Sequence, residues 1–352
     1  MSTHRLALIG YGGMAGWHHR NIRDRIPSVE VACTYDIRPE VAETAAENGL
    51  EFRTTLEAVL SDPTIDIVTI ATPNNFHKEL AIAALEAGKA VVCEKPVTLN
   101  AAELEEIIAV SKRTGKLFSV HQNRRWDRDY AVVQEILKQN LIGNPYFIES
   151  RVQGSGRFLH GWRGHKVNGG GIMLDWGVHM IDQLMDLIDS PVVSVDTKMV
   201  SLFNEGVDDN FKMFLTFENG IVGLVEIACN CFINLPRWHI SATEGTAVID
   251  NWDCEGKIVR LTGEAMMQWE DQIVYTSAGP TRTMAPRPKH TITELPLPEV
   301  TADWVAYYEN IAAVLDGKAD LIVRPEQALR VMKVIDAAFE SSKSGKSISL
   351  RV

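Results

Sequence analysis

The chain has 352 residues, a formal net charge of −11 and five cysteines. Its length exceeds what one hydrophobic core normally organises, so we expect two domains. Because the negative charge repels a phosphate backbone and no block of Lys and Arg offsets it, nucleic acid is not an expected partner. The sequence shows neither an apolar run of the roughly 18 residues that span a bilayer nor a secretion signal. We therefore expect a cytoplasmic protein that does not bind membranes and keeps its cysteines reduced.

Short apolar runs alternate with helix-like segments over the first third of the chain. The apolar runs cover residues 6–9, 29–35, 65–71, 90–93 and 117–120. Strands that are apolar along their whole length are buried on both faces, as in a parallel sheet covered by helices. Asn100, with Glu103 three residues later, predicts the capped start of a helix that continues to Thr114. Residues 1–122 are thus predicted to form an α/β domain with a doubly wound parallel sheet.

The pattern changes after Asn123, where we expect a second domain that covers residues 123–352. Strand-like runs with Gly- and Asn-containing turns dominate from residue 192 to about residue 273, which predicts an α+β domain with a large, mainly antiparallel open sheet. Residues 279–300 contain five prolines and are expected to be irregular. The other predicted elements are a strand at 146–153 and helices at 130–140, 172–188, 303–315 and 325–341.

The first predicted strand leads into Gly10-Tyr11-Gly12-Gly13-Met14-Ala15, which a helix-like segment follows. In this G-x-G-x-x-A turn, Gly10 permits the tight turn, Gly12 lets the backbone approach a pyrophosphate, and Ala15 keeps the helix close to the sheet. The N-terminus of the helix then offers free N–H groups to the phosphates. A glycine-rich turn also occurs for packing alone, so the motif by itself leaves that alternative open.

Asp36 favours the dinucleotide-binding interpretation of this turn. It lies at the end of the second predicted strand, 21 residues after Ala15, where a carboxylate binds the ribose hydroxyls of the adenosine half. Asp36 repels the 2′-phosphate of NADP whereas Arg38 attracts it, so we expect NAD as the preferred cofactor and NADP as a possible one. The predicted cofactor-binding residues of this Rossmann domain are Gly10, Gly12, Gly13, Met14, Ala15, Asp36 and Arg38.

Lys95 and the pair Asp175 and His179 are the candidate reacting groups. Lys95 follows the apolar strand at 90–93, at the sheet edge where such folds bind ligands, and its ammonium can polarise a carbonyl or stabilise an alkoxide. Asp175 and His179 are four residues apart in a predicted helix, so the carboxylate can orient the imidazole as a general base. The alternatives are a surface lysine, simple helix support by the Asp–His pair, and a metal site formed by His179 with Asp175 or Asp182. Because the spacing places no third ligand, we expect no metal.

A loop after the predicted strand at 146–153 combines aromatic and basic side chains, namely Arg157, Trp162, Arg163 and Lys166. An indole can stack on a sugar face, and guanidinium or ammonium groups can donate to hydroxyls or a carboxylate. The same side chains can also hold the loop in place, and the sequence does not separate the two roles.

These segments together resemble the Gfo/Idh/MocA family of dehydrogenases, named after glucose-fructose oxidoreductase, inositol dehydrogenase and a rhizopine-catabolism protein. The resemblance spans nearly the whole chain. It is carried, in order, by residues 10–15, Ala71-Thr72-Pro73-Asn74 with His77, Glu94-Lys95-Pro96, Asn123-Arg124-Arg125-Trp126-Asp127 and residues 169–179. It implies an NAD(P)-dependent dehydrogenase that acts on CH–OH groups.

The resemblance also implies roles for individual residues. His179 would be the acid/base, Asp175 would orient it, and Lys95 would hydrogen-bond the reacting oxygen near the nicotinamide. Further cofactor-binding positions are Thr72, Pro73, Asn74, His77 and Glu94. The substrate-binding candidates are Lys95, Arg124, Arg157, Trp162, Arg163, Asp175 and His179.

The expected activity is transfer of a hydride between the nicotinamide and a hydroxyl-bearing carbon of a sugar, polyol or sugar derivative. One alternative is an enzyme that keeps its NAD bound and transiently oxidises a glycoside to cleave or rearrange it. Another is an NAD-sensing regulator without chemistry, which the presence of Lys95, Asp175 and His179 argues against. An open sheet leaves one apolar face uncovered, so we expect a homo-oligomer, a dimer or tetramer, that forms through this sheet.

Overall fold

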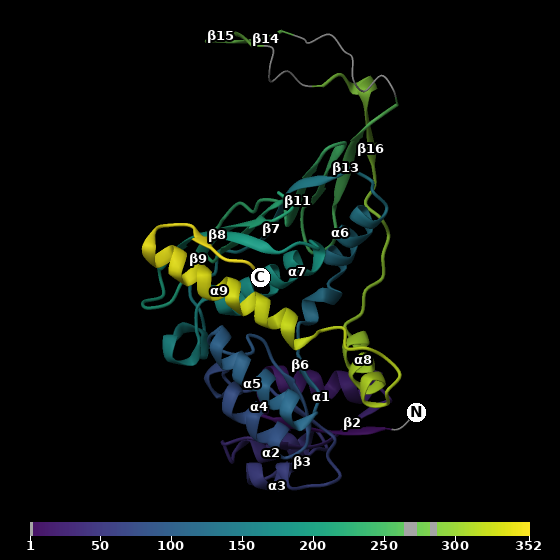
Figure 1. Ribbon diagram of the computed structural model, residues 1–352, viewed down its shortest axis with the longest axis vertical. Helices are drawn as coiled ribbons and strands as arrows, with labels where there is room; N and C mark the ends of the chain where they lie inside the picture. Colours follow the sequence, from purple (N-terminus) through teal and green to yellow (C-terminus); the bar gives the residue numbers. More distant parts are fainter. Residues whose placement is uncertain (1–2, 264–272, 282–286) are drawn as a thin grey trace.

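The computed structural model describes residues 3–263, 273–281 and 287–352 (Figure 1). Within these ranges the first part of the chain forms a six-stranded sheet in the order β3-β2-β1-β4-β5-β6, with every pair of neighbours parallel. Its strands are β1 (His4–Ile9), β2 (Val29–Tyr35), β3 (Glu51–Arg53), β4 (Ile67–Ile70), β5 (Ala90–Cys93) and β6 (Phe118–Val120). This confirms the predicted doubly wound parallel sheet.

Helices cover this sheet because each strand must cross over to reach its parallel neighbour. They are α1 (Gly13–Arg25), α2 (Val41–Glu47), α3 (Leu56–Leu60), α4 (His77–Glu86) and α5 (Ala101–Thr114). The predicted cap of α5 is present, since Asn100 Oδ1 accepts from the backbone N–H of Glu103 at 3.0 Å. The carboxylate of Glu103 reaches back one residue further than expected, to the N–H of Leu99 at 3.0 Å.

The second part of the chain forms a nine-stranded sheet within the described residues, in the order β16-β13-β12-β11-β7-β10-β9-β8-β17. The pair β10 and β7 is parallel and the other pairs are antiparallel, which confirms the large, mainly antiparallel sheet. The strands are β7 (Pro145–Gln153), β8 (Val192–Val200), β9 (Asn210–Phe217), β10 (Val222–Ala228), β11 (Trp238–Ala242), β12 (Gly245–Ile249), β13 (Gly256–Leu261), β16 (Ile292–Leu295) and β17 (Ile348–Ser349).

The stretch at 279–300, predicted to be irregular, contains a strand of the large sheet. Strand β16 pairs with β13 at the sheet edge, and the flanking Pro288 and Pro296 lie outside it. Proline at the ends of an edge strand removes no ladder hydrogen bond, so the proline content concealed the strand. Strands β14 (Val274–Thr276) and β15 (Gly279–Thr281) form a separate two-stranded sheet. Residues 264–272 and 282–286, which fall within the predicted strand-rich and irregular stretches, lie outside the described residues.

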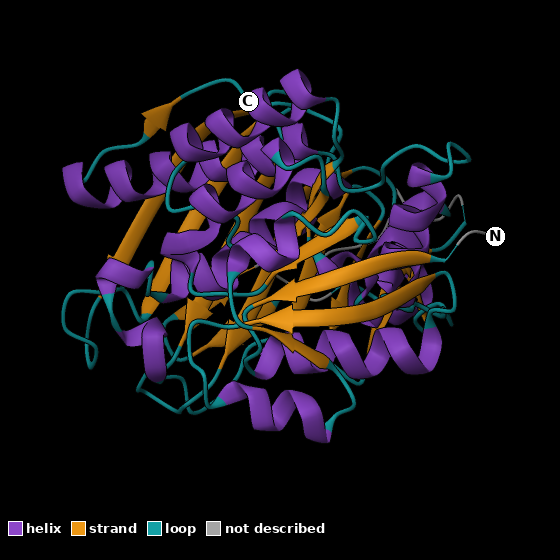
Figure 2. Cartoon of the chain, turned by 90° about the horizontal axis from the view of Figure 1, so that it is seen from below, coloured by secondary structure: helices purple, strands orange, loops and turns teal. Residues whose placement is uncertain are grey.

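Four helices complete the described fold, namely α6 (Arg128–Lys138), α7 (Val178–Leu187), α8 (Val305–Leu315) and α9 (Pro325–Ser344). Helix α9 lies between the two sheets and contacts α5, α7, β6 and β8 (Figure 1). Figure 2 shows the strands running through the middle of the molecule with helices on either side. No helix in the described part of the chain is long and apolar enough to cross a membrane.

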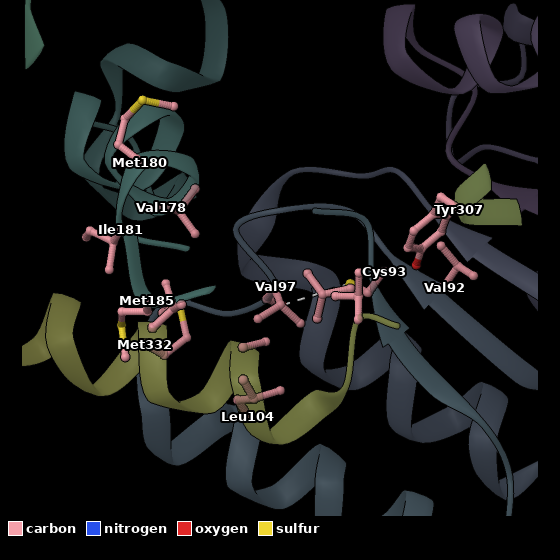
Figure 3. Close-up of a cluster of buried hydrophobic side chains, with 14 of the residues drawn as sticks. Val92, Cys93, Val97, Leu104, Val178, Met180, Ile181, Met185, Tyr307 and Met332 are labelled. Carbon is pink, nitrogen blue, oxygen red and sulfur yellow. Dashed lines mark hydrogen bonds between the residues drawn. The ribbon is translucent and has the colours of Figure 1, made fainter. Parts of the chain in front are cut away.

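One hydrophobic core spans both parts of the chain. Val97 and Leu104 come from the first part and lie beside Met185 and Met332 from the second (Figure 3). Helix α8 also returns to the parallel sheet, where Tyr308 Oη lies 3.1 Å from Thr69 Oγ1 on β4. The domain boundary between residues 122 and 123 stays a prediction. Helix α8 comes from the second part of the chain but packs on the sheet of the first part.

A buried ion pair fixes α7 against the segment that follows β6. Arg125 donates from Nε and Nη2 to the two carboxylate oxygens of Asp182, each at 2.7 Å, and its Nη1 lies 2.9 Å from Asp186 Oδ1. The side chains of Arg125 and Asp182 are 6% and 2% exposed. Removing Asp182 would leave the buried guanidinium with Asp186 as its remaining counter-charge, and removing Arg125 would leave the Asp182 carboxylate buried without one.

We predict that Asp182→Ala lowers the free energy of unfolding by up to about 3–5 kcal/mol, because the buried guanidinium loses its bidentate partner and keeps only Asp186. Urea denaturation followed by circular dichroism measures this change. The matched control is Asp189→Ala, which removes an exposed carboxylate just after the same helix and should change stability by less than about 0.5 kcal/mol. A loss of under about 1 kcal/mol for Asp182→Ala would contradict the assignment.

Candidate active site

The glycine turn between β1 and α1 has the geometry that a dinucleotide requires. Gly10 has a φ of +85°, and a Cβ there would lie 2.7 Å from the carbonyl oxygen of Ala71, so no other residue fits. A Cβ on Gly12 or Gly13 would meet nothing within 4 Å, so the turn faces open space at the N-terminus of α1. Ala15 is fully buried against the sheet, and Met14 is 37% exposed.

Asp36 and Arg38 lie together beside this turn. Asp36 Oδ2 accepts from the backbone N–H of Tyr11 at 2.8 Å and from Arg38 Nη2 at 2.9 Å. Its Oδ1 accepts from the backbone N–H and Nε of Arg38, at 3.0 and 2.9 Å. Burial opposes ionisation of Asp36, but these bonds outweigh it and lower the pKa of the carboxyl. A cavity of about 490 Å³ opens here, lined by Tyr11, Gly12, Gly13, Gly16, Arg20, Arg38, Glu40, Val41, Thr44 and Asn48. Its open glycine backbone and two guanidinium groups fit the adenosine half of a nicotinamide dinucleotide.

The segment from Thr72 to His77 connects the two parts of the chain. Thr72 and Pro73 are partly exposed, whereas Asn74 is 2% exposed and donates from Nδ2 to the carbonyl of Gly169 at 3.0 Å. His77 is fully buried, and its ring nitrogens lie 3.0 Å from the carbonyl oxygens of Thr72 and Pro96. Both ring nitrogens of His77 thus face backbone carbonyls, so its ring packs against the backbone of Thr72 and Pro96.

Lys95 bridges the edge of the parallel sheet and the turn before α7. Its Nζ donates to the backbone carbonyl of Asp175 at 2.8 Å and to Asp175 Oδ1 at 3.1 Å. The other carboxylate oxygen of Asp175 accepts from Arg163 Nε at 2.9 Å. Burial disfavours the carboxylate, but the charges of Lys95 and Arg163 outweigh it and lower the pKa of Asp175. The residue is thus an ionised carboxylate shared by two cations.

The predicted helix at 172–188 contains a wider turn at its start. Residues Met173–Gly177 form a π-helical turn, and regular helix begins at Val178. A π-helical turn contains more residues than an α-helical turn, so His179, four residues after Asp175, is not placed directly above it on one helix face. Within the described residues no hydrogen bond joins Asp175 to His179. The expectation that Asp175 orients His179 by direct pairing is wrong in this structure, because Lys95 and Arg163 take both of its oxygens.

His179 is an unpaired imidazole beside this ion pair. It is 3% exposed, and its Nδ1 is buried with no hydrogen-bond partner among the described residues. Burial lowers the pKa of His179 well below 6.5, and the positive charges of Lys95 and Arg124 lower it further. The ring is consequently neutral at physiological pH, and a neutral imidazole can accept a proton.

The predicted substrate-binding residues separate into two groups. Arg163 contacts Asp175 directly and stacks on Trp162, with its guanidinium carbon 4.5 Å from the ring centroid. Arg124 lies 4.2 Å from the ring centroid of Trp176, beside His179. Arg157 instead donates to Asn230 and stacks on Phe203 and Phe232, in contacts that do not involve the Lys95–Asp175 pair.

Two tryptophans that sequence reasoning missed belong to this site. The rings of Trp176 and Trp252 lie 6.1 Å apart with Arg124 packed over both. Trp176 lies inside the motif at 169–179, so its place next to Asp175 was a usable signal. Trp252 lies in the turn between β12 and β13, and nothing local in the sequence connects it to the site.

The alternative metal site formed by His179 with Asp182 is not present, because Arg125 donates hydrogen bonds to both carboxylate oxygens of Asp182. Among the described residues, one group of side chains lies close enough together to be considered for a metal, namely His18, Glu94 and His121. Glu94, predicted to line the nicotinamide half, is 7% exposed and turns its carboxylate toward these two histidines.

The fold and the glycine turn define a protein with an NAD-binding Rossmann domain followed by an α+β domain. A model described as "Oxidoreductase family, NAD-binding Rossmann fold" matches residues 4–122, and one described as "GFO/IDH/MocA C-terminal domain" matches residues 130–248. The chain belongs to the Gfo/Idh/MocA family of oxidoreductases.

Relatives of known name and structure match over most or all of the chain. An NAD-binding protein from Listeria innocua is 42% identical, with a TM-score of 0.95 over 99% of this chain and 100% of that chain. The scyllo-inositol 2-dehydrogenase (NADP(+)) IolW of Bacillus subtilis is 27% identical over 99% of this chain and 97% of its own length. The scyllo-inositol 2-dehydrogenase (NAD(+)) of the same organism is 29% identical over 70% of this chain and 73% of its own length.

The lowered pKa of His179 predicts a pH dependence of stability. The unfolded chain takes up a proton on this imidazole below about pH 6.5, whereas the folded chain does not, so the free energy of unfolding falls as the pH decreases from 7 to 5. This residue contributes up to about 1.4 kcal/mol per pH unit in that window. Urea denaturation at pH 5, 6 and 7 should show a shallower decline for His179→Gln than for the unmodified chain. The same substitution at the exposed His160 is the control and should leave the slope unchanged. Equal slopes for all three proteins would contradict a neutral buried imidazole.

Proposed function

We propose that this oxidoreductase transfers a hydride between a nicotinamide cofactor and a hydroxyl-bearing carbon of a sugar or polyol. The observation that carries the proposal is the contact of Lys95 with Asp175, which brings an ammonium group from the Rossmann domain next to a neutral imidazole on α7. Named relatives support the substrate class, because two of them are scyllo-inositol dehydrogenases and another is a 1,5-anhydro-D-fructose reductase.

Each side chain has its own role in the proposed reaction. His179 takes the hydroxyl proton as the carbon is oxidised, and because Nδ1 is sealed from solvent, Nε2 is the nitrogen that meets the substrate. Lys95 donates a hydrogen bond to the reacting oxygen, and Asp175 holds Lys95 in position for this. The bound nicotinamide nucleotide supplies the hydride acceptor.

The aromatic and basic side chains around this centre fit a polyhydroxylated ring. Trp176, Trp252 and Arg124 form a wall beside His179, where an apolar ring face can stack and hydroxyls can accept hydrogen bonds. Arg163 donates to Asp175 and stacks on Trp162, which adds a guanidinium and an indole next to the same carboxylate. We assign Arg157 no substrate contact, since it packs between Phe203 and Phe232.

We propose NAD as the preferred cofactor and NADP as an accepted one. Asp36 is an ionised carboxylate beside the glycine turn, and Arg20 and Arg38 line the cavity at this turn. Fluorescence titration of NADH and NADPH against the purified chain tests this preference. Tighter binding of NADPH would refute it.

Replacement of His179 by Ala tests the catalytic assignment. A panel of sugars and polyols that begins with scyllo-inositol first identifies a substrate by NADH or NADPH formation. The variant should then lower turnover by about 10² to 10⁴, because the proton loses its acceptor, while the dissociation constant for NADH stays the same. His160→Ala is the matched control at an exposed imidazole and should keep full turnover. Full turnover in His179→Ala would refute the role. Cofactor that stays bound through purification without formation of free NADH would indicate the retained-NAD mechanism instead.

We also propose that the chain forms a homo-oligomer through the outer face of the large sheet. Helix α7 covers the inner face, where a Cβ on Gly223 would meet Leu184. The outer face is less apolar than expected. Phe147 and Phe214 are 42% and 47% exposed at one end, and Arg151 pairs with Glu226 at the other. An apolar patch beside ion pairs is typical of a subunit interface.

Phe214→Asp is predicted to shift this assembly toward smaller species, because it places a charge in the apolar end of the proposed interface. Light scattering coupled to size-exclusion chromatography measures the mass. The control is Tyr275→Asp, which changes an aromatic residue that is 75% exposed on the separate β14–β15 sheet. A stable monomer for the unmodified chain, or an unchanged mass for Phe214→Asp, would contradict the proposal.

A further inference from the structure

A buried network of hydrogen-bonded polar side chains lies next to the backbone of Lys95. We call it the Glu94 cluster, and its members are Thr69 on β4, Tyr308 on α8, His18 on α1, Glu94 after β5 and His121 after β6. The five side chains come from five different elements, and both imidazoles are fully buried. None of the roles described above uses His18, His121 or Tyr308.

The bonds of the cluster converge on one carboxylate. Glu94 Oε1 lies 2.7 Å from His18 Nε2 and 2.8 Å from His121 Nδ1. Its Oε2 accepts from the backbone N–H of Lys95 at 3.2 Å. Further back, His18 Nδ1 lies 3.1 Å from Tyr308 Oη, which lies 3.1 Å from Thr69 Oγ1. Both oxygens of Glu94 are thus used, one by two imidazoles and the other by the residue proposed to bind the reacting oxygen.

The negative charge on Glu94 decides which atom donates and which accepts in each side-chain hydrogen bond of the Glu94 cluster. Burial opposes its ionisation, but the facing imidazoles outweigh burial and hold its pKa well below the ordinary value. An ionised carboxylate only accepts, so both facing nitrogens must be N–H donors. His18 is then the Nε2–H tautomer and accepts from Tyr308 at Nδ1, and Tyr308 accepts from Thr69. His121 carries a proton on Nδ1, and a second proton on its buried Nε2 would find no acceptor among the described residues. His121 is therefore the Nδ1–H tautomer, the minor form of free histidine in water.

A metal ion does not account for this arrangement. Tetrahedral ligands at about 2.1 Å from a zinc ion are roughly 3.4 Å apart, and the two nitrogens are 2.7 and 2.8 Å from the shared oxygen, as in hydrogen bonds. The remaining nitrogen of His121 is buried without a partner, among the rings of Trp17, Trp304 and Tyr307. A site closed by aromatic rings offers an ion neither an entry path nor water ligands.

We propose that His18 and His121 are positioning residues, which hold the ionised Glu94 carboxylate in one orientation so that Glu94 fixes the backbone of Lys95 beside Asp175. The backbone supports the same geometry, since the N–H of Glu94 donates to Ile70 at 2.9 Å and the N–H of His121 donates to Cys93 at 2.8 Å. A single carboxylate thus connects the dinucleotide helix α1 with the residue after β5. The effect on turnover rests on the proposed function, whereas the tautomers do not.

The tautomers are the first test, because they need no substrate. Long-range ¹H–¹⁵N correlation spectra of the full chain labelled on histidine report which ring nitrogen carries the proton. The spectra of His18→Gln and His121→Asn assign the two rings among the ten histidines. We expect His121 as Nδ1–H and His18 as Nε2–H at pH 7, and a shift of His121 toward Nε2–H in Glu94→Gln. His121 in the Nε2–H form in the unmodified chain, or one stoichiometric divalent metal per chain in protein purified without chelator, would overturn the proposal.

Two pairs of variants then separate positioning from general support of the fold. His121→Asn and His18→Gln keep a donor at the place of the lost N–H, whereas His121→Leu and His18→Leu remove it. With the substrate found in the screen, the leucine variants should lower kcat at least tenfold with the NADH dissociation constant within twofold, and the amide variants should recover kcat to within threefold of the original. Equal losses in the leucine and amide variants, or unchanged kcat in the leucine variants, would overturn the proposal. If no substrate is found, the proposed function fails while the tautomer result still decides the cluster.

Discussion

The contact of Lys95 with Asp175 is the interaction on which the arrangement of the site depends. It joins the C-terminal edge of β5 to the turn that precedes α7, two segments 80 residues apart. The side chains are 16% and 11% exposed, so each charge is largely removed from water and depends on the other. Asn74 makes a second bond between the same two regions, to Gly169. These two bonds join the first part of the chain to the second next to His179.

Lys95 also contributes to the low pKa of the neighbouring imidazole, although burial of His179 is the larger cause. Two cations, Lys95 and Arg163, surround the one carboxylate of Asp175, and Arg124 adds a third positive charge nearby. Burial, together with the positive charges of Lys95 and Arg124, keeps His179 neutral. A neutral imidazole next to an ammonium group gives one group that can accept a proton and one that can stabilise negative charge on oxygen. Oxidation of an alcohol needs both functions at the same oxygen atom.

The sequence predicted the parts of the structure that local physics controls. Gly10 is required by its own backbone angle, and the α5 cap depends on residues three apart. Features set by distant partners were not predictable. Asp175 bonds to Lys95 and Arg163 because the turn is π-helical, and four-residue spacing assumes a regular helix. The orientation of Glu94 is decided by imidazoles 76 and 27 residues away, and Trp252 approaches Trp176 only through the pairing of the large sheet.

Asp36 and Arg38 show why residue types alone do not decide between the two cofactors. A carboxylate accepts about four hydrogen bonds, and Asp36 already accepts four, three of them from Arg38. A ribose hydroxyl that binds Asp36 would therefore have to displace one of these donors. The side chain of Arg38 is 54% exposed, so its guanidinium can turn into solvent when Asp36 binds another donor. The choice between the cofactors would then depend on whether the released guanidinium meets a 2′-phosphate or water. Arg20 lines the same cavity as Arg38, so a 2′-phosphate bound in it would meet two guanidinium groups.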